Sequence, residues 1–286
     1  MSRKTLIISE PLKSEKVVFS QKIADEALAR GWQVFECEKE DIFSEDGKVF
    51  CNAREYPGGN NLRAAVADFD CIHFRPHPPM DMGYITALHL LKLVEDQVPI
   101  YNKPSTILNF PKKIFPHILG DYSPPTLISQ DKNEILEFAR EHDQIVVKPL
   151  YGYGGFDIKK LSAKEVEQED FEGIYIFQKF LEEVREGTVR VNMVAGEVYA
   201  YLVKLPEEGS IESNFFRGGL KETKLTSKQI QVCDKLKEYD ILYAGADFIG
   251  DYLLEVNITC ASAMSVEELF GLKTEQKIWD VIENKC

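Results

Sequence analysis

Long hydrophobic runs are missing from this sequence. Although 44% of the 286 residues are hydrophobic, no stretch reaches the ~18 consecutive apolar residues that identify a membrane-spanning helix. The apolar run near the N-terminus, Leu6 to Ile8, is too short for the hydrophobic region of a secretory signal. We therefore expect a cytoplasmic protein that has no membrane partner.

Basic residues are fewer than acidic residues in this chain. The chain has 34 Lys and Arg against 47 Asp and Glu, which gives a formal net charge of −13 at pH 7. Such an excess of negative charge disfavours sequence-independent binding of nucleic acid, so we expect no nucleic-acid partner. It does not exclude a small anionic ligand, because a pocket can gather basic side chains in an acidic protein.

Common signatures of metal and nucleophile sites are absent. The cysteines form no CxxC pair, which argues against a zinc ribbon or a thioredoxin-like motif and favours buried, reduced thiols. The histidines form no HExxH, and the sequence has no GxSxG elbow, Walker A loop or complete dinucleotide fingerprint. Cys260 could serve as a nucleophile, but the sequence places no histidine partner beside it.

Strands and helices alternate in the first third of the chain. The apolar spacing predicts strands over Lys4–Ser9, Gln33–Cys37, Cys71–Phe74 and Val98–Tyr101, and helices over Ser14–Arg30 and Met82–Glu95. Asp46-Gly47 predicts a hairpin turn. This order indicates an α/β domain over residues 1–106.

The rest of the chain predicts two further units. Residues 107–181 contain one expected helix and three expected strands: Asn133–His142, Ile145–Lys148, Phe156–Lys160 and Ile174–Phe180. Residues 182–286 contain expected hairpins Thr188–Val194/Glu197–Lys204 and Tyr243–Ile249/Tyr252–Val256, a helix over Ser227–Tyr239, and two closing helices. The fold class predicted from these patterns is α/β with an α+β central unit.

A glycine-rich segment follows one of the buried strands. Lys148 ends the strand, and Gly152, Gly154 and Gly155 follow it closely. Glycine lets backbone N–H groups approach phosphate oxygens, and a nearby lysine supplies positive charge. The segment is either a phosphate-binding loop or a plain glycine-rich turn.

Asp247, Glu255 and Asn257 form a second candidate cluster. Glu255 and Asn257 are two residues apart on one expected strand and share a face. A three-residue hairpin loop would place Asp247 opposite Glu255 on that face, whereas a two-residue loop would put them on opposite faces. Oxygen ligands on one face would suit Mg²⁺ held with phosphates, and an ordinary wet sheet face is the alternative.

Two basic features complete the candidates. Arg75 begins a proline-rich segment that ends at Asp81, just past a buried strand, where α/β layers often bind ligands. Arg190 and Lys204 lie on the two strands of one expected hairpin, and both could face a phosphate or a carboxylate. The alternatives are a rigid turn and a solvated basic pair.

In their order and spacing, these motifs resemble the ATP-grasp superfamily and, within it, the prokaryotic glutathione synthetase family. The resemblance covers nearly the whole chain. The matching positions are Arg75, Pro78, Pro79 and Asp81; Tyr101–Ser105; Lys113 in a following helix; Lys148–Leu150; the glycine loop; Gln178–Leu181; Glu186–Val191; Asn214–Gly219; and Asp247–Asp251 with Glu255–Thr259.

The resemblance implies an ATP-grasp fold with an N-terminal domain (1–106), a lid subdomain (107–181) and a metal-binding subdomain (182–286). It implies a ligase that activates a carboxylate with ATP and joins it to an amine, most simply γ-glutamylcysteine to glycine. It also implies a homo-oligomer, small-molecule or short-peptide substrates, and Mg²⁺ as the metal, with Mn²⁺ as an alternative.

The same resemblance assigns roles to individual residues. It gives ATP binding to Lys113, Lys148, Lys204, Gly154 and Gly155, with adenine against Gln178, Lys179, Phe180 and Leu181. It assigns contact with the transferred phosphoryl group to Arg190 and Asn214. It assigns binding of the peptide substrate to Arg75, Asp81 and Thr259, and binding of the metal to Asp247, Glu255 and Asn257.

Some positions depart from the family pattern. His77 stands where the family usually has Asp, Thr188 replaces another Asp, and Cys260–Ser262 replaces a usual Ser-Pro. These changes lie on the substrate side, while the metal-binding residues are intact. Two alternatives therefore stay open: a related ligase with another acceptor, and a non-catalytic ATP-binding module.

Overall fold

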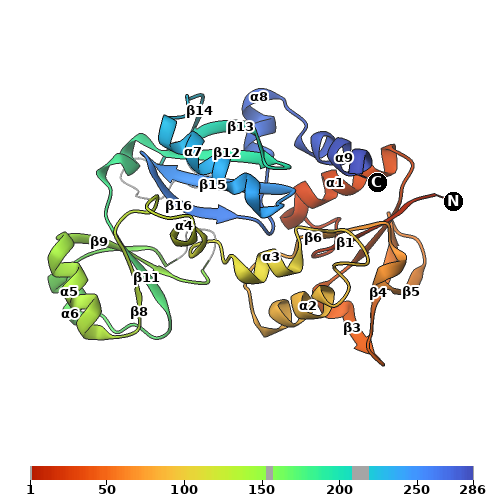
Figure 1. Cartoon of the computed structure of the whole chain (residues 1–286), viewed down its shortest axis with the longest axis horizontal. Coiled ribbons are helices and arrows are strands. Elements are labelled where there is room, and N and C mark those ends of the chain that lie inside the picture. Colours follow the sequence, from red (N-terminus) through yellow and green to blue (C-terminus); the bar gives the residue numbers. More distant parts are fainter. Residues whose placement is uncertain (1, 153–156, 208–218, 286) are drawn as a thin grey trace.

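The computed structural model describes residues 2–152, 157–207 and 219–285. Its strands form three separate sheets, which follow one another along the chain (Figure 1). The first sheet uses residues 4–101, the second 126–179 and the third 188–257. Each sheet falls within one of the three units predicted from the sequence, although the boundaries themselves stay a prediction.

The first sheet has the strand order β3-β4-β2-β1-β6-β7, with β5 paired to β4. β1 runs parallel to β2 and β6, and β6 runs parallel to β7, as the alternation of strands and helices predicts. Its strands are β1 (Lys4–Ile8), β2 (Gln33–Cys37), β3 (Ile42–Glu45), β4 (Lys48–Tyr56), β5 (Asn61–Ala65), β6 (Cys71–Phe74) and β7 (Ile100–Tyr101).

Helices cover both faces of this sheet. Leu6 and Ile8 on β1 pack in the cluster that contains residues of α2 (Met82–Lys92), whereas Ile7 packs in the cluster that contains residues of α1 (Val18–Ala29). Because successive side chains of a strand point to opposite faces, α1 and α2 lie on opposite sides. The sheet is therefore buried on both faces, which is typical of parallel sheets.

The second sheet carries helices α5 (Lys132–His142) and α6 (Ala163–Gln168), which pack against each other. Its strand order is β10-β9-β11-β8. Of the strand expected over Phe156–Lys160, Phe156 lies outside the described residues, and among those described the strand begins at Lys159, which pairs with Val147 on β9. The strands are β8 (Thr126–Ser129), β9 (Gln144–Pro149), β10 (Lys159–Ser162) and β11 (Tyr175–Lys179).

The third sheet is antiparallel, in the order β14-β13-β12-β15-β16. Its first hairpin turns at Ala195-Gly196, where both residues have positive φ, as Asp46 and Gly47 do in the first sheet. Two-residue hairpin turns of this hand need such conformations. The strands are β12 (Thr188–Val194), β13 (Glu197–Lys204), β14 (Leu220–Lys221), β15 (Tyr243–Ile249) and β16 (Tyr252–Asn257).

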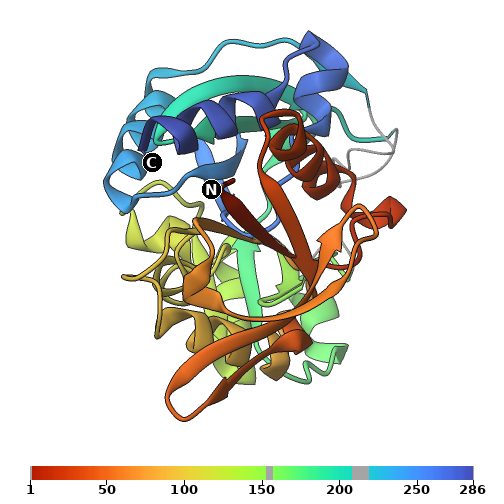
Figure 2. The same cartoon turned by 90° about the vertical axis from the view of Figure 1, so that its right-hand side faces the viewer.

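The remaining helices connect the units. α3 (Pro104–Asn109) and α4 (Phe115–Ile118) lead from the first sheet to the second, and α7 (Ser227–Leu236) and α8 (Met264–Phe270) flank the third. α9 (Thr274–Lys285) ends the described chain and packs on α1 (Figures 1 and 2). Trp279 on α9 donates a 2.8 Å hydrogen bond to the Ile23 carbonyl. None of the helices in the described ranges is long and apolar enough to cross a membrane.

Candidate functional site

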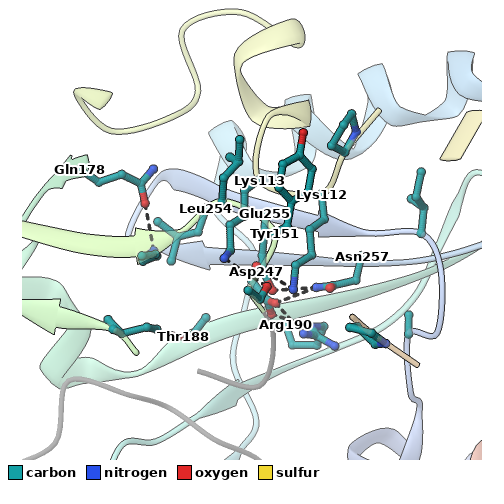
Figure 3. A pocket seen from close by; sticks show the side chains of 18 of the residues that line it. Lys112, Lys113, Tyr151, Gln178, Thr188, Arg190, Asp247, Leu254, Glu255 and Asn257 are labelled. Atoms are coloured by element: carbon teal, nitrogen blue, oxygen red, sulfur yellow. Dashed lines mark hydrogen bonds and ion pairs between the residues drawn. The ribbon is translucent and has the colours of Figure 1, made fainter. Parts of the chain in front are cut away.

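A cavity of about 480 Å³ lies where the second and third sheets meet the loop between α3 and α4 (Figure 3). The second sheet contributes β9 and β11, and the third contributes β12, β13, β15 and β16. The predicted site residues that line it are Lys113, Lys148, Gln178, Lys179, Phe180, Leu181, Arg190, Lys204, Asp247, Glu255, Asn257 and Thr259.

Asp247 and Glu255 are direct partners across the β15–β16 hairpin. The turn has only two residues, because Ile249 pairs with Tyr252, yet the two carboxylates still meet. The register shifts beyond Phe248 and Leu253, so that Leu254 is an extra residue on β16. This bulge does what a longer loop would have done and brings both acidic side chains to the cavity.

Arg190 on β12 is opposite Asp247 on β15. Its Nε and Nη2 donate to the two Asp247 carboxylate oxygens, both at 2.5 Å. Burial disfavours the charged guanidinium, but attraction to Asp247 raises the pKa of Arg190 above its usual value. Gly245 leaves room for this fork, since a Cβ there would lie 3.0 Å from Arg190 Nη1.

Glu255 is surrounded by donors. Its Oε1 accepts a 3.0 Å hydrogen bond from Asn257 Nδ2, and its Oε2 lies 3.8 Å from Lys112 Nζ. Burial alone would raise the pKa of Glu255, but Lys112, the Asn257 hydrogen bond, Lys113 and Lys148 together lower it to about 2. Glu255 is therefore ionised over the whole range in which proteins work.

The chemistry of these side chains fits a hard divalent cation. Asp247 and Glu255 offer carboxylate oxygens, and Asn257 would add its amide oxygen after a half-turn of the amide, whose Nδ2 now faces both carboxylates. Among the described residues no three acidic, histidine or cysteine side chains gather into a complete metal cage. The set therefore suits Mg²⁺ that shares its coordination with phosphate oxygens and water.

Lysines surround the same cavity. Lys113 Nζ donates to the carbonyls of Pro149 and Gly152, the latter at 3.2 Å, and Lys148 Nζ donates to Gln178 Oε1 at 2.9 Å. Burial, reinforced by repulsion from Lys112, lowers the pKa of Lys113 to about 7, and burial also lowers that of Lys148.

Lys204 lines the cavity from β13, the strand next to the one that carries Arg190. Burial and repulsion from Arg190 lower the pKa of Lys204 to about 8. Three lysines whose ammonium groups lack full compensation therefore converge on one space, which favours an anionic ligand there. Lys113 itself lies between α3 and α4, so its expected place within a helix was wrong.

An apolar slot adjoins the basic part of the cavity. Phe180 and Leu181 follow β11 and pack in one cluster with Ile249, Val146 and Leu254. These side chains give the cavity an apolar wall, against which a flat base such as adenine could pack. The backbone N–H groups of Lys179 and Phe180 already donate to the Pro125 and Gln144 carbonyls at 3.0 Å, so these two donors are not free for a ligand.

Only one of the three predicted substrate residues lines the cavity. Thr259 lines the cavity, but Arg75 does not; its buried guanidinium donates to Ser20 Oγ at 3.0 Å and to the Ala261 carbonyl at 2.8 Å. Asp81 caps α2 by accepting from the Tyr84 N–H at 2.7 Å. Arg75 thus holds the Cys260–Ser262 loop, and both residues have structural contacts in addition to any role with substrate.

Some predicted residues lie outside the described part of the chain, namely Gly154, Gly155 and Asn214. Other cavity residues were not predicted, chiefly Lys112 and the apolar Ile249 and Leu254. The Lys112-Lys113 pair was a visible signal for the first of these. Nothing in the local pattern distinguishes the two apolar side chains from ordinary core residues.

Comparisons with known proteins agree with this geometry. Residues 4–107 match the N-terminal domain of prokaryotic glutathione synthetase, and residues 112–271 match its ATP-grasp domain. The glutathione synthetase of Agrobacterium fabrum is 34% identical, with 92% of this chain and 90% of that protein covered. That of Pseudomonas putida is 29% identical, with 100% of this chain and 99% of that protein covered.

Solved structures share the fold at lower identity. A RiPP-associated ATP-grasp ligase of Chryseobacterium gregarium, in complex with ADP and a leader and core peptide, superposes with a TM-score of 0.71 at 16% identity, covering 100% of this chain and 98% of that chain. The ATP-grasp ligase PsnB, with Mg and ADP, gives 0.67 at 16% identity, covering 98% and 97%. These likenesses bear out the ATP-grasp fold. The chain belongs to the prokaryotic glutathione synthetase family of ATP-dependent, ATP-grasp ligases.

Proposed function

We propose that the chain joins γ-glutamylcysteine to glycine and releases ADP and phosphate. A carboxylate is a poor electrophile, so the γ-phosphoryl group of ATP first converts it to an acyl phosphate. The amine then attacks the acyl carbon, and phosphate leaves. The observation that carries this proposal is the pairing of Asp247 with Glu255 on the same cavity wall as Arg190, in a cavity that three lysines also line.

Different residues of the cavity bind different parts of ATP. Lys113 and Lys148 hold the α- and β-phosphates, and Lys204 adds charge from β13. Phe180, Leu181 and Leu254 enclose the adenine. Arg190 contacts the transferred phosphoryl group while it stays fixed by Asp247. We also assign Gly154, Gly155 and Asn214 to ATP and the phosphoryl group, on the resemblance alone.

Asp247, Glu255 and Asn257 would hold Mg²⁺ or Mn²⁺. When bound with ATP, the metal neutralises charge that builds up on the phosphate oxygens. The chain's own contribution is to fix the carboxylates. Arg190 orients Asp247, and Asn257 and Lys112 orient Glu255.

Mass spectrometry of the products tests the function. The protein is incubated with Mg·ATP, γ-glutamylcysteine and each of a panel of amino acids. A tripeptide formed only with glycine supports the proposal. The absence of ADP with every acceptor, despite ATP binding, would instead favour a non-catalytic binding module.

A second candidate is a ligase for another acceptor. Arg75, which the resemblance assigns to the peptide substrate, is buried and holds the Ala261 carbonyl in the altered Cys260–Ser262 loop. Thr259 and this loop line the cavity. ATP turnover with an acceptor other than glycine in the same experiment would support this candidate.

Two further assignments accompany the proposed reaction. We place it in the cytoplasm, because it consumes ATP and a thiol peptide that must stay reduced. Homo-oligomerisation stays a prediction, and the molar mass in solution, measured by light scattering, would test it.

A further inference from the structure

Lys112 is fixed beside the metal-binding strand by its own backbone. The residue lies in the loop between α3 and α4, and its carbonyl accepts a 3.0 Å hydrogen bond from the Val256 N–H on β16. Val256 lies between the two proposed metal ligands of that strand. The Lys112 side chain reaches from this anchor toward Glu255, and its Nζ lies 3.8 Å from Oε2 (Figure 3).

Every carboxylate oxygen of the pair already has a protein partner. Arg190 donates to both oxygens of Asp247. Asn257 donates to Oε1 of Glu255, and Oε2 faces Lys112. The two negative charges of Asp247 and Glu255 are therefore balanced by two positive charges of the protein.

This balance is unfavourable for a metal ion that arrives alone. A bare divalent cation at the carboxylates would meet the ammonium of Lys112 at short range, with Lys113, Lys148 and Lys204 lining the same cavity. Repulsion between such charges is strong where solvent is partly excluded. A nucleoside triphosphate changes this balance of charge, because its negatively charged oxygens can pair with the lysines and with the metal at the same time.

We infer that Lys112 makes divalent-metal binding at Asp247, Glu255 and Asn257 depend on a bound nucleoside triphosphate. In the ligand-free protein Lys112 is the counter-ion of Glu255. When the triphosphate enters, the Lys112 ammonium pairs with a phosphate oxygen instead, and Oε2 of Glu255 becomes available to the metal. Lys112 is thus a positioning residue, and this inference rests on the proposed function of the cavity.

An ordinary surface ion pair is the simpler explanation of the same contact. Such pairs join two freely moving, exposed side chains. Here the side chains of Lys112 and Glu255 are only 23% and 25% exposed, the lysine backbone is bonded to β16, and the glutamate is a proposed ligand. These features distinguish Lys112 from the lysines of surface ion pairs such as Lys159, whose side chain is 51% exposed.

Titration of Mn²⁺ against the protein tests the inference, with free Mn²⁺ followed by its paramagnetic resonance signal. The titration is done with wild type and Lys112→Met, each with and without a non-hydrolysable ATP analogue. Without nucleotide, Lys112→Met should bind Mn²⁺ about tenfold more tightly than wild type, because the competing ammonium is gone. The analogue should improve Mn²⁺ binding less in the variant than in wild type.

Lys228→Met is the matched control. Its Nζ lies over the Tyr252 ring of the same hairpin, 5.1 Å from the ring centre, and it does not line the cavity. It removes the same charge from the protein and should leave Mn²⁺ affinity as in wild type. Lys112→Gln, a second neutral variant, serves if Lys112→Met fails to fold by circular dichroism.

Two results would overturn the inference. One rejects only the role of Lys112, and the other also rejects the proposed metal ligands. Equal Mn²⁺ affinity of wild type and Lys112→Met without nucleotide, with Glu255→Gln abolishing Mn²⁺ binding in both, rejects the role of Lys112 alone. Mn²⁺ binding that Glu255→Gln leaves unchanged, with and without the analogue, rejects the metal assignment itself and the inference with it.

Discussion

Arg190 and Asp247 face each other on neighbouring strands and form two parallel hydrogen bonds of 2.5 Å. Asp247 is at the same time the cross-strand partner of Glu255. One aspartate thus connects the guanidinium on β12 with the second carboxylate on β16. The cavity wall is a single electrostatic unit that spans three strands.

Asp247→Asn should destabilise the fold. Arginine keeps its charge, so the variant leaves the Arg190 guanidinium buried without a counter-ion. We expect the free energy of unfolding to fall by about 3 kcal/mol, as measured by urea titration. The control is Glu167→Gln, which removes an exposed partner of Arg140 and should cost less than ~1 kcal/mol. Equal losses in both variants would contradict the account.

Glu255→Gln should abolish turnover while the protein stays folded. The change keeps the shape of the side chain and removes one metal-binding charge. Loss of several kcal/mol of charge stabilisation corresponds to a decrease in kcat of about 10³-fold. Steady-state ADP release measures it, with circular dichroism as the folding check.

Glu183→Gln is the comparison for this variant. Glu183 is exposed and lies beside Gly250 at the turn of the same hairpin, and it does not line the cavity. Its turnover should match wild type. Wild-type turnover in Glu255→Gln would show that the metal assignment is wrong.

Lys113→Arg should change how nucleotide binding depends on pH. The pKa of Lys113 is lowered to about 7 in the ligand-free protein, chiefly by burial, so at about pH 8 its amine is mostly neutral. Phosphate favours the charged form, so binding should take up a proton, and affinity should weaken as pH rises above 7. Calorimetry in buffers of different ionisation enthalpy measures that uptake.

Arginine is charged at every pH in this range, so the variant should take up less proton. Some uptake should remain, because the pKa of Lys204 is also lowered, to about 8. Identical uptake in wild type and Lys113→Arg would mean that Lys113 does not pair with the phosphates.

Gly187→Ala should disturb the strand that carries Arg190. Gly187 has φ +103°, and a Cβ there would lie 2.6 Å from the Lys204 carbonyl oxygen and press against Val203. We expect unfolding free energy to fall by about 3 kcal/mol, since backbone must move. Gly271→Ala is the control, because its φ is also positive but a Cβ would meet nothing within 4 Å. That variant should cost only about 1 kcal/mol, and equal costs would contradict the predicted clash.

Local patterns predicted the elements of the fold well. Asp46-Gly47 and Ala195-Gly196 form their hairpin turns with positive φ at both residues, a conformation that the glycine of each pair adopts without strain. The short strands β5 and β8 were not predicted. β8 pairs with the distant β11, whereas β5 follows its partner β4 closely but has no fully buried residue, so its sequence lacks a clear apolar alternation. The packing of α9 on α1 likewise depends on contacts such as Trp279 to Ile23, which no local pattern encodes.

The site was only partly predictable for a related reason. The sequence allowed two arrangements of Asp247 and Glu255: on one face of the sheet with a three-residue hairpin loop, or on opposite faces with a two-residue loop. The structure has the two-residue loop, yet both side chains share a face because of the bulge at Leu254. A bulge is set by the packing of both strands, not by the residues of the turn. The positions of Arg190 and Lys112 next to the carboxylates likewise follow from strand pairing and loop anchoring.

Transfer of a carboxylate oxygen tests the central claim most directly. γ-Glutamylcysteine labelled with heavy oxygen in its reacting carboxylate is converted in the presence of Mg·ATP and glycine, and the phosphate is analysed by mass spectrometry. Activation through an acyl phosphate in this cavity predicts one heavy oxygen in the phosphate released with each amide bond. Amide formation with unlabelled phosphate, or with AMP and pyrophosphate as products, would contradict the account.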